Sequence, residues 1–180
     1  MRIGIFGGSF DPVHNGHVGI ARRAIRELRL DRLVVVPASL SPFKTSAADA
    51  PLFPPEKRAE MVRAAFAGIP EAEVDLREME RGGVSYAIDT VREIASENPG
   101  AEIVFLVGED AMEGVPRWKD SAELRRLCAF YAFPRTAESS SEVRRRLRGG
   151  ESVASLVPPA VAAIAVAAAG RADSPPQASI

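Results

Sequence analysis

Short apolar runs alternate with longer amphipathic stretches along the 180 residues of the chain. We expect the apolar runs to form buried strands, at residues 2–6, 32–37, 72–76, 103–107 and 128–133. We expect the amphipathic stretches to form helices, at residues 16–28, 55–67 and 86–97. This alternation predicts an α/β fold, a doubly wound parallel sheet of the Rossmann-like type with helices on both faces. Sheets of this kind bind ligands outside the carboxyl ends of their strands.

The domain organisation is expected to be simple. We find no internal repeat and no sign of a second domain, so residues 1–170 are predicted to form a single domain. Residues 171–180 contain Pro175-Pro176 and are predicted to form a flexible C-terminal tail. The N-terminus enters a strand without a signal-like segment, and the apolar run 160–169 is too short to span a bilayer. We therefore expect a cytoplasmic protein.

Composition narrows the class of partner. The net charge is −1, so no overall basic field attracts nucleic acid or anionic lipid, and neither is expected as a partner. The single cysteine, Cys128, excludes an internal disulfide and any metal cluster built on cysteines. The sequence leaves the oligomeric state open and is compatible with a homo-oligomer.

The segment that follows the first expected strand carries the most chemical information. Residues 7–17 read Gly-Gly-Ser-Phe-Asp-Pro-Val-His-Asn-Gly-His. Gly8 and its neighbour let the backbone approach a ligand closely, and Ser9 offers a hydroxyl and an N–H. His14 and His17, the only histidines, flank the start of the expected helix, where both can face one bound anion. Such a pair can also bind zinc, but no third ligand is evident, so we interpret the segment as a phosphate-binding loop without a metal held by the protein.

Several segments of the chain resemble one family. The first loop is similar to the signature of the HxGH nucleotidyltransferase superfamily, and nearly the whole chain resembles the bacterial nicotinate-nucleotide adenylyltransferases. The supporting segments are Ser-Ser-Ser-Glu-Val-Arg at 139–144, Ser-Tyr-Ala-Ile-Asp-Thr at 85–90 and Gly-Glu-Asp at 108–110. At the first of these, Ser140 or Ser141 can also be expected on physical grounds to cap a helix.

The resemblance implies transfer of AMP from ATP to nicotinate mononucleotide, with Mg²⁺ carried by ATP, in a nucleotidyltransferase fold. His14 and His17 would then bind the α-phosphate under attack. The resemblance assigns ATP and its phosphates to Gly8, Ser9, Phe10, Lys44, Gly108, Asp110, Ser140, Ser141 and Arg144. It assigns nicotinate mononucleotide to Ser85, Tyr86, Ala87, Trp118 and Arg135.

The chain departs from the family pattern at three places. Ala87 replaces a threonine, which removes a side-chain hydroxyl but keeps a backbone N–H. Phe43 stands where a histidine is usual, beside Lys44. The stretch between Trp118 and Ser139 is shorter than usual, so that a strand is either missing or one strand serves for two.

Other functions fit parts of the pattern. A phosphopantetheine adenylyltransferase shares the first loop but usually has threonine where His14 stands. Cytidylyltransferases share the histidine pair with a different second signature. A non-enzymatic nucleotide sensor would need a decayed site, and the intact His14, His17, Asp110 and Arg144 argue against that.

Overall fold

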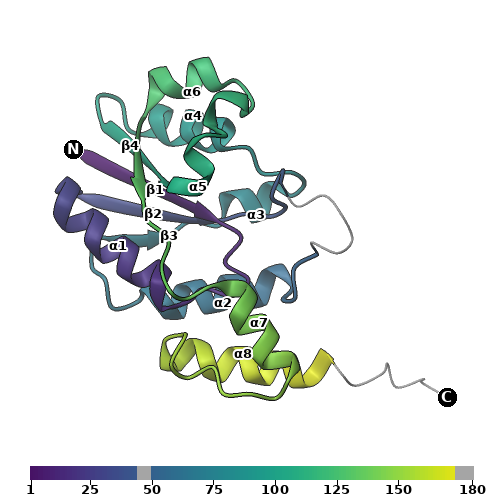
Figure 1. Ribbon diagram of the computed structural model, residues 1–180. Coiled ribbons are helices and arrows are strands. Elements are labelled where there is room, and N and C mark those ends of the chain that lie inside the picture. Colours follow the sequence, from purple (N-terminus) through teal and green to yellow (C-terminus); the bar gives the residue numbers. More distant parts are fainter. Residues whose placement is uncertain (44–49, 173–180) are drawn as a thin grey trace.

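A single parallel sheet forms the centre of the protein. The computed structural model describes residues 1–43 and 50–172. The strand order is β3-β2-β1-β4-β5, and every neighbouring pair is parallel. The strands are β1 (Arg2–Gly8), β2 (Arg32–Pro37), β3 (Ala72–Val74), β4 (Glu102–Gly108) and β5 (Ala129–Phe133). The chain starts in the middle, builds one side through β2 and β3, and then crosses to β4 and β5 (Figure 1). This order confirms the predicted doubly wound sheet.

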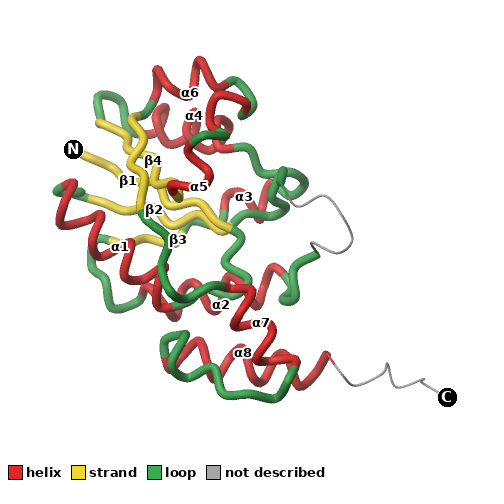
Figure 2. Tube along the Cα trace, in the orientation of Figure 1, coloured by secondary structure: helices red, strands yellow, loops and turns green. Residues whose placement is uncertain are grey.

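Helices connect the strands and cover both faces of the sheet. They are α1 (Asn15–Leu28), α2 (Pro55–Phe66), α3 (Arg77–Arg81), α4 (Ala87–Glu97), α5 (Glu109–Met112), η2 (Val115–Arg117, a 3₁₀ turn), α6 (Ser121–Leu127), α7 (Ser140–Arg148) and α8 (Pro159–Ala172). Figure 2 shows the strands as one layer between helices. No helix within residues 1–43 and 50–172 is both long and apolar enough to cross a membrane.

Alternation of side chains along the strands divides the apolar core into two layers. On one face of the sheet, Ile3 and Ile5 of β1 pack against Ile88 of α4. On the opposite face, Phe6 of the same strand lies in one apolar cluster with Met61 of α2. Helices α1 and α2 therefore cover one face, and α4 and α6 cover the other (Figure 1). A sheet buried on both faces explains why the strands are nearly continuous apolar runs.

The five expected strands and three expected helices are confirmed, with differences at their ends. Strand β1 continues to Gly8, two residues beyond the expected end, because Gly7 and Gly8 pair with Val36 and Pro37. Glycine is a poor strand former, so the sequence pattern stopped short. Helix α8 runs to Ala172, two residues into the expected tail.

The C-terminal helices add a second layer beyond α2. Val161 and Ala165 of α8 are buried in the same core cluster as Met61 of α2, and α8 lies along α2 on the side away from the sheet (Figure 1). Val143 of α7 joins this cluster, which brings the start of α7 next to the loop after β1. Among the described residues, the shortened stretch between Trp118 and Ser139 contributes one strand, β5.

Candidate active site

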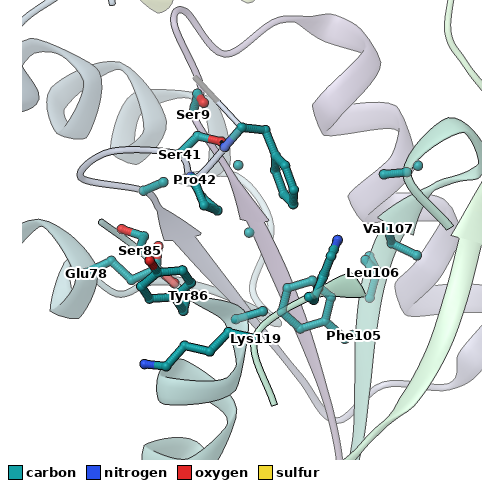
Figure 3. A pocket seen from close by; sticks show the side chains of 18 of the residues that line it. Ser9, Ser41, Pro42, Glu78, Ser85, Tyr86, Phe105, Leu106, Val107 and Lys119 are labelled. Atoms are coloured by element: carbon teal, nitrogen blue, oxygen red, sulfur yellow. The ribbon is translucent and has the colours of Figure 1, made fainter. Parts of the chain in front are cut away.

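A cavity of about 280 Å³ opens at the carboxyl ends of β1 and β4. Gly8 and Ser9 line it at the end of β1, and Gly108 lines it at the end of β4. Figure 3 shows Ser9 and Val107, which come from these two strand ends. Ser85, Tyr86 and Ala87 form a further side, which we call the pyridine wall after the role that the sequence resemblance implies for it, and Trp118 also lines the cavity. Segments far apart in sequence thus meet where parallel sheets bind ligands.

The loop of residues 7–17, which we call the phosphate loop, is held from inside the protein. The Asp11 carboxylate is 3% exposed and accepts hydrogen bonds from the N–H groups of Leu52 (2.8 Å) and Phe53 (2.9 Å). Phe10 has a φ of 44°, in the left-handed region, and its ring is buried against His17 with ring centroids 4.9 Å apart. The ring of Phe10 therefore belongs to the core, and only its backbone can face a ligand.

His14 and His17 form a stacked pair at the start of α1. Their ring centroids are 3.7 Å apart. The His14 N–H donates to Nδ1 of His17 at 3.2 Å, which places the proton of a neutral His17 ring on Nε2. Burial lowers the pKa of His14 to about 4, and burial followed by the charge of His14 lowers the pKa of His17 well below its usual range. Both rings are therefore neutral near pH 7, and each can donate one hydrogen bond.

The serine-rich start of α7 docks onto the phosphate loop. Ser139 caps the helix by accepting from the Glu142 N–H at 3.2 Å, so the expectation of a cap at Ser140 or Ser141 was wrong. Ser140 instead donates from its hydroxyl to the Pro12 carbonyl at 2.9 Å. The pattern of three serines fixes only the neighbourhood of the cap, because any of them can accept the bond.

Arg144 ties α7 to the same loop. Its Nη1 donates to the Asp11 carbonyl at 2.6 Å and lies 3.6 Å from the Asp11 carboxylate, and its Nη2 contacts the Ser141 hydroxyl at 3.1 Å. The two signatures that suggested a polyphosphate site are therefore in direct contact. The Arg144 guanidinium therefore holds the backbone of the phosphate loop.

Asp110 and Arg135, which were assigned to different substrates, form an ion pair. The distance from Arg135 Nη2 to Asp110 Oδ2 is 2.7 Å, and the Arg135 side chain is 81% exposed. The Arg135 guanidinium lowers the pKa of the Asp110 carboxyl. Asp110 also lies so close to the backbone of Gly108 that a Cβ there would approach its Oδ1 to 2.6 Å. Gly108 is therefore required for the present position of the Asp110 carboxylate.

Aromatic rings gather around Trp118 at the other end of the cavity. Trp118 meets Phe105 edge-on at 5.9 Å between ring centroids, and exposed Phe43 lies 6.0 Å away. Lys119 lies 4.5 Å from the centroid of the Tyr86 ring and 3.1 Å from the Asp89 carboxylate. A flat ring and a cation thus border the pyridine wall. Lys44 lies outside the described residues.

A second cavity, of about 260 Å³, lies beside α1 and was not predicted from the sequence. Gly16, Arg135 and Thr136 line it, and Phe133 lines both cavities. A Cβ on Gly16 would meet the Thr136 hydroxyl at 2.2 Å, so the glycine of the His-x-Gly-His motif lets the loop after β5 approach α1. The Phe6 ring connects Phe133, which lines both cavities, with the histidine pair. Its centroid lies 5.7 Å from that of Phe133 and 6.0 Å from that of His17.

Two buried charged residues near the first cavity were also missed. Arg58 of α2 is 1% exposed, and Glu78 of α3 is 7% exposed and lines the cavity. Arg58 shares the buried face of α2 with Met61 and Val62, so an arginine at apolar helical spacing was an available signal. Glu78 lies in a helix too short to show periodicity.

Comparison with known proteins agrees with this geometry. A family model described as cytidylyltransferase-like matches residues 5–163, from β1 into α8. A probable nicotinate-nucleotide adenylyltransferase of Gemmatimonas aurantiaca is 37% identical over 90% of this chain and 88% of its own length. One of Thermus thermophilus is 38% identical over 89% of this chain and 94% of its own length. The chain belongs to the nicotinate-nucleotide adenylyltransferase family.

Solved structures support the fold of this family member. The crystal structure of a Vibrio parahaemolyticus protein described as a putative nicotinate-nucleotide adenylyltransferase has a TM-score of 0.75 at 21% identity, and covers 92% of this chain and 99% of that one. A Plasmodium falciparum nicotinic acid mononucleotide adenylyltransferase complexed with NaAD has a TM-score of 0.70 at 16% identity, covering 92% and 95%. Membership of the nicotinate-nucleotide adenylyltransferase family confirms the resemblance seen in the sequence, while the role of each residue stays a prediction.

Proposed function

We propose that this protein transfers AMP from ATP to nicotinate mononucleotide, forming nicotinate adenine dinucleotide and pyrophosphate in NAD biosynthesis. The observation that carries the proposal is the placement of two cavities on either side of one phosphate loop. Residues 8 and 9 of the loop line the first cavity, residues 15 and 16 line the second, and the histidine pair lies close to both in the chain. Two substrates can therefore meet at one phosphorus atom.

Each cavity suits one substrate. The first is bordered by Trp118 and the pyridine wall, where an aromatic ring can stack and the backbone N–H groups at the start of α4 can face a carboxylate. The second begins at Gly16 and adjoins Asp110 through its partner Arg135. We assign the pyridine mononucleotide to the first and the nucleoside of ATP to the second, which moves Arg135 from the mononucleotide, where the resemblance had placed it, to ATP.

The reaction exchanges one phosphorus–oxygen bond for another. An oxygen of the mononucleotide phosphate attacks the α-phosphorus of ATP, and the bond to the β-phosphate breaks with its electron pair leaving on pyrophosphate. A phosphate monoester is already ionised near neutral pH, so no general base is required. The protein contributes alignment of two anions and stabilisation of the charge that develops during transfer.

The residues of the phosphate loop match this task. His17 presents an Nε2–H donor because its Nδ1 accepts from the backbone. His14 has a buried Nδ1 with no hydrogen-bond partner among the described residues. We propose that both rings donate to the α-phosphate, and that Ser9, Arg144 and the start of α7 face the remaining phosphates.

Mg²⁺ enters with ATP as part of the substrate. Within residues 1–43 and 50–172, no group of three or more His, Cys, Asp or Glu side chains comes together that could hold a metal ion. Asp11 is held by backbone N–H groups and Asp110 by Arg135. The ion would therefore be bound chiefly through phosphate oxygens, as is usual for Mg²⁺ with nucleotides.

Release of pyrophosphate from ATP with a panel of acceptors tests the proposal. Nicotinate mononucleotide should support turnover. Phosphopantetheine should not, and CTP should not replace ATP. Turnover with phosphopantetheine alone would overturn the proposal, and ATP binding without turnover on any acceptor would indicate a nucleotide sensor. Including nicotinamide mononucleotide measures the consequence of Ala87, which leaves recognition of the pyridine substituent to backbone groups.

A further inference from the structure

Two buried charged side chains lie beside the first cavity and have no part in the chemistry above. Glu78 of α3 is 7% exposed and lines the cavity, and Arg58 of α2 is 1% exposed. Buried charges are costly unless they are well hydrogen-bonded. Their partners therefore indicate what they do.

Glu78 holds the pyridine wall from behind. The Thr90 hydroxyl of α4 donates to Glu78 Oε1 at 2.5 Å. Burial raises the pKa of the Glu78 carboxyl, and the nearby Thr90 and Ser85 side chains offset part of this rise. Figure 3 shows Glu78 next to Ser85 and Tyr86 on one side of the cavity. Ser85 immediately precedes Tyr86, the N-cap residue of α4. Glu78 thus fixes the direction in which the first N–H groups of α4 point.

The same contacts continue across the floor of the site. The Ser39 N–H donates to the Ser85 hydroxyl oxygen at 3.0 Å, and the Ser85 N–H donates to the Leu40 carbonyl at 2.8 Å. The Arg58 guanidinium then donates to the carbonyl of Ser39 (3.1 Å) and to that of Ser9 (2.8 Å). Hydrogen bonds therefore run without a break from the pyridine wall, through the loop after β2, to the phosphate loop.

We propose that Glu78 and Arg58 are positioning residues at the two ends of a buried brace, which sets the spacing between the pyridine wall and the phosphate loop. This inference rests on the proposed function, because the spacing matters only if one substrate spans both. A mononucleotide bound at its ring must present its phosphate to the α-phosphorus of ATP. A misplacement of about 1 Å lowers such rates by about a hundredfold.

Substitution of Glu78 tests the pyridine end. Glu78→Ala leaves the Thr90 hydroxyl without its acceptor and removes the carboxylate next to Ser85, so it should raise KM for nicotinate mononucleotide by about ten- to a hundredfold, with KM for ATP within about twofold of wild type. Glu78→Gln, whose amide oxygen can still accept from the Thr90 hydroxyl, should recover most of the loss. Glu80→Ala is the matched control, since Glu80 lies on the same short helix and is exposed.

KM is informative even when part of a preparation is unfolded, because it does not depend on enzyme concentration. Equal values of KM for nicotinate mononucleotide in Glu78→Ala and Glu80→Ala would overturn the proposal, as would equal rises of KM for both substrates. If Glu78→Ala does not fold, Thr90→Val removes the hydroxyl that donates to Glu78, and a several-fold rise of KM for nicotinate mononucleotide is then expected. An unchanged KM for nicotinate mononucleotide in Thr90→Val would then overturn the proposal.

Substitution of Arg58 tests the phosphate end. Arg58→Lys keeps the charge but lacks the planar group that donates to the carbonyls of Ser9, Ala38 and Ser39 together, so kcat should fall by about tenfold. Binding of nicotinate mononucleotide, followed by the fluorescence of Trp118, the only tryptophan, should change little. Arg63→Lys, at an exposed position of the same helix, is the control, and an equal kcat in both variants would contradict the brace. A wild-type protein that forms no dinucleotide would instead refute the proposed function.

Discussion

The phosphate end and the pyridine end of the site are built in different ways. At the phosphate end, His14 is 6% exposed and Asp11 is 3% exposed, and backbone groups fix the Asp11 carboxylate. At the pyridine end, Phe43 is 69% exposed. At the rim of the site, by which we mean its exposed edge, the Arg135 side chain is 81% exposed. The first region is pre-organised by the core, whereas the second can adjust to a ligand. Changes at the phosphate end should therefore affect chemistry and stability, and changes at the rim should affect the binding of one substrate.

The largest effect is expected at His17. His17→Ala removes an Nε2–H donor at the reacting phosphate, so kcat should fall by about 10²–10³-fold. His17→Gln, which keeps a side-chain N–H, should retain part of the activity. Steady-state pyrophosphate release measures both, and thermal unfolding checks that both variants are folded. A folded His17→Ala variant with nearly normal kcat would remove His17 from the mechanism.

Asp11 should be the most important side chain for stability within the phosphate loop. Asp11→Ala leaves the Leu52 and Phe53 N–H groups without an acceptor and removes the carboxylate beside Arg144. The free energy of unfolding should fall by about 2–4 kcal/mol in urea denaturation. Asp31→Ala is a suitable control, because the exposed Asp31 also accepts from a backbone N–H, that of Arg2. If the free energy of unfolding falls by the same small amount in Asp11→Ala and Asp31→Ala, Asp11 does not hold the loop.

The low pKa of His14 predicts how stability depends on pH. The unfolded chain takes up a proton near pH 6.5, whereas folded His14 does so only near pH 4. Stability should therefore be highest above pH 6.5 and fall as the pH is lowered toward 4, by about 3 kcal/mol from this group. Urea denaturation at several pH values should show a smaller slope for His14→Asn than for wild type over this range. Equal slopes would mean that His14 is not held neutral.

Substitution of Trp118 should weaken the binding of one substrate, nicotinate mononucleotide. Trp118→Ala should raise KM for nicotinate mononucleotide by about tenfold through loss of ring stacking, with KM for ATP unchanged. Trp118→Phe keeps a flat ring and should lose much less. If Trp118→Ala raises KM for both substrates equally, the tryptophan supports the core through Phe105 instead of binding the pyridine ring.

The smallest effect on stability is expected at Arg135. Its ion pair with Asp110 is exposed, so Arg135→Ala should change the free energy of unfolding by less than about 0.5 kcal/mol. Arg135→Ala should instead raise KM for ATP, because Arg135 lines the second cavity. A loss of stability as large as that expected for Asp11→Ala would contradict the distinction between the two ends.

The sequence predicted the parts of the molecule that follow a repeating pattern. The strands are apolar runs buried on both faces, and α1 and α4 show clear helical spacing, so periodicity located them. The phosphate loop was found because its residue types are unusual at the end of a strand. It was also possible to predict that residues 139–144 begin a helix, although the cap is Ser139.

What could not be predicted depends on contacts between distant segments. The pairing of Asp110 with Arg135 joins residues 25 positions apart that had been assigned to separate substrates. The hydrogen bonds of Glu78 to Thr90 and of Arg58 to Ser9 arise only once α3, α4 and α2 pack around the sheet. Helix α3 is too short to show periodicity, and the apolar spacing that marks Arg58 as buried does not show which carbonyls it contacts. The second cavity and the brace therefore required the structure.

The most direct test of the central claim follows the phosphorus atoms of ATP. Wild-type protein is incubated with nicotinate mononucleotide and with ATP labelled at either the α- or the γ-phosphate, and the products are separated. The account predicts that the α-label appears in the dinucleotide and the γ-label in pyrophosphate, in equal amounts. Appearance of the γ-label in the mononucleotide acceptor or in free phosphate, with the α-label remaining in ADP, would contradict adenylyl transfer at the histidine pair.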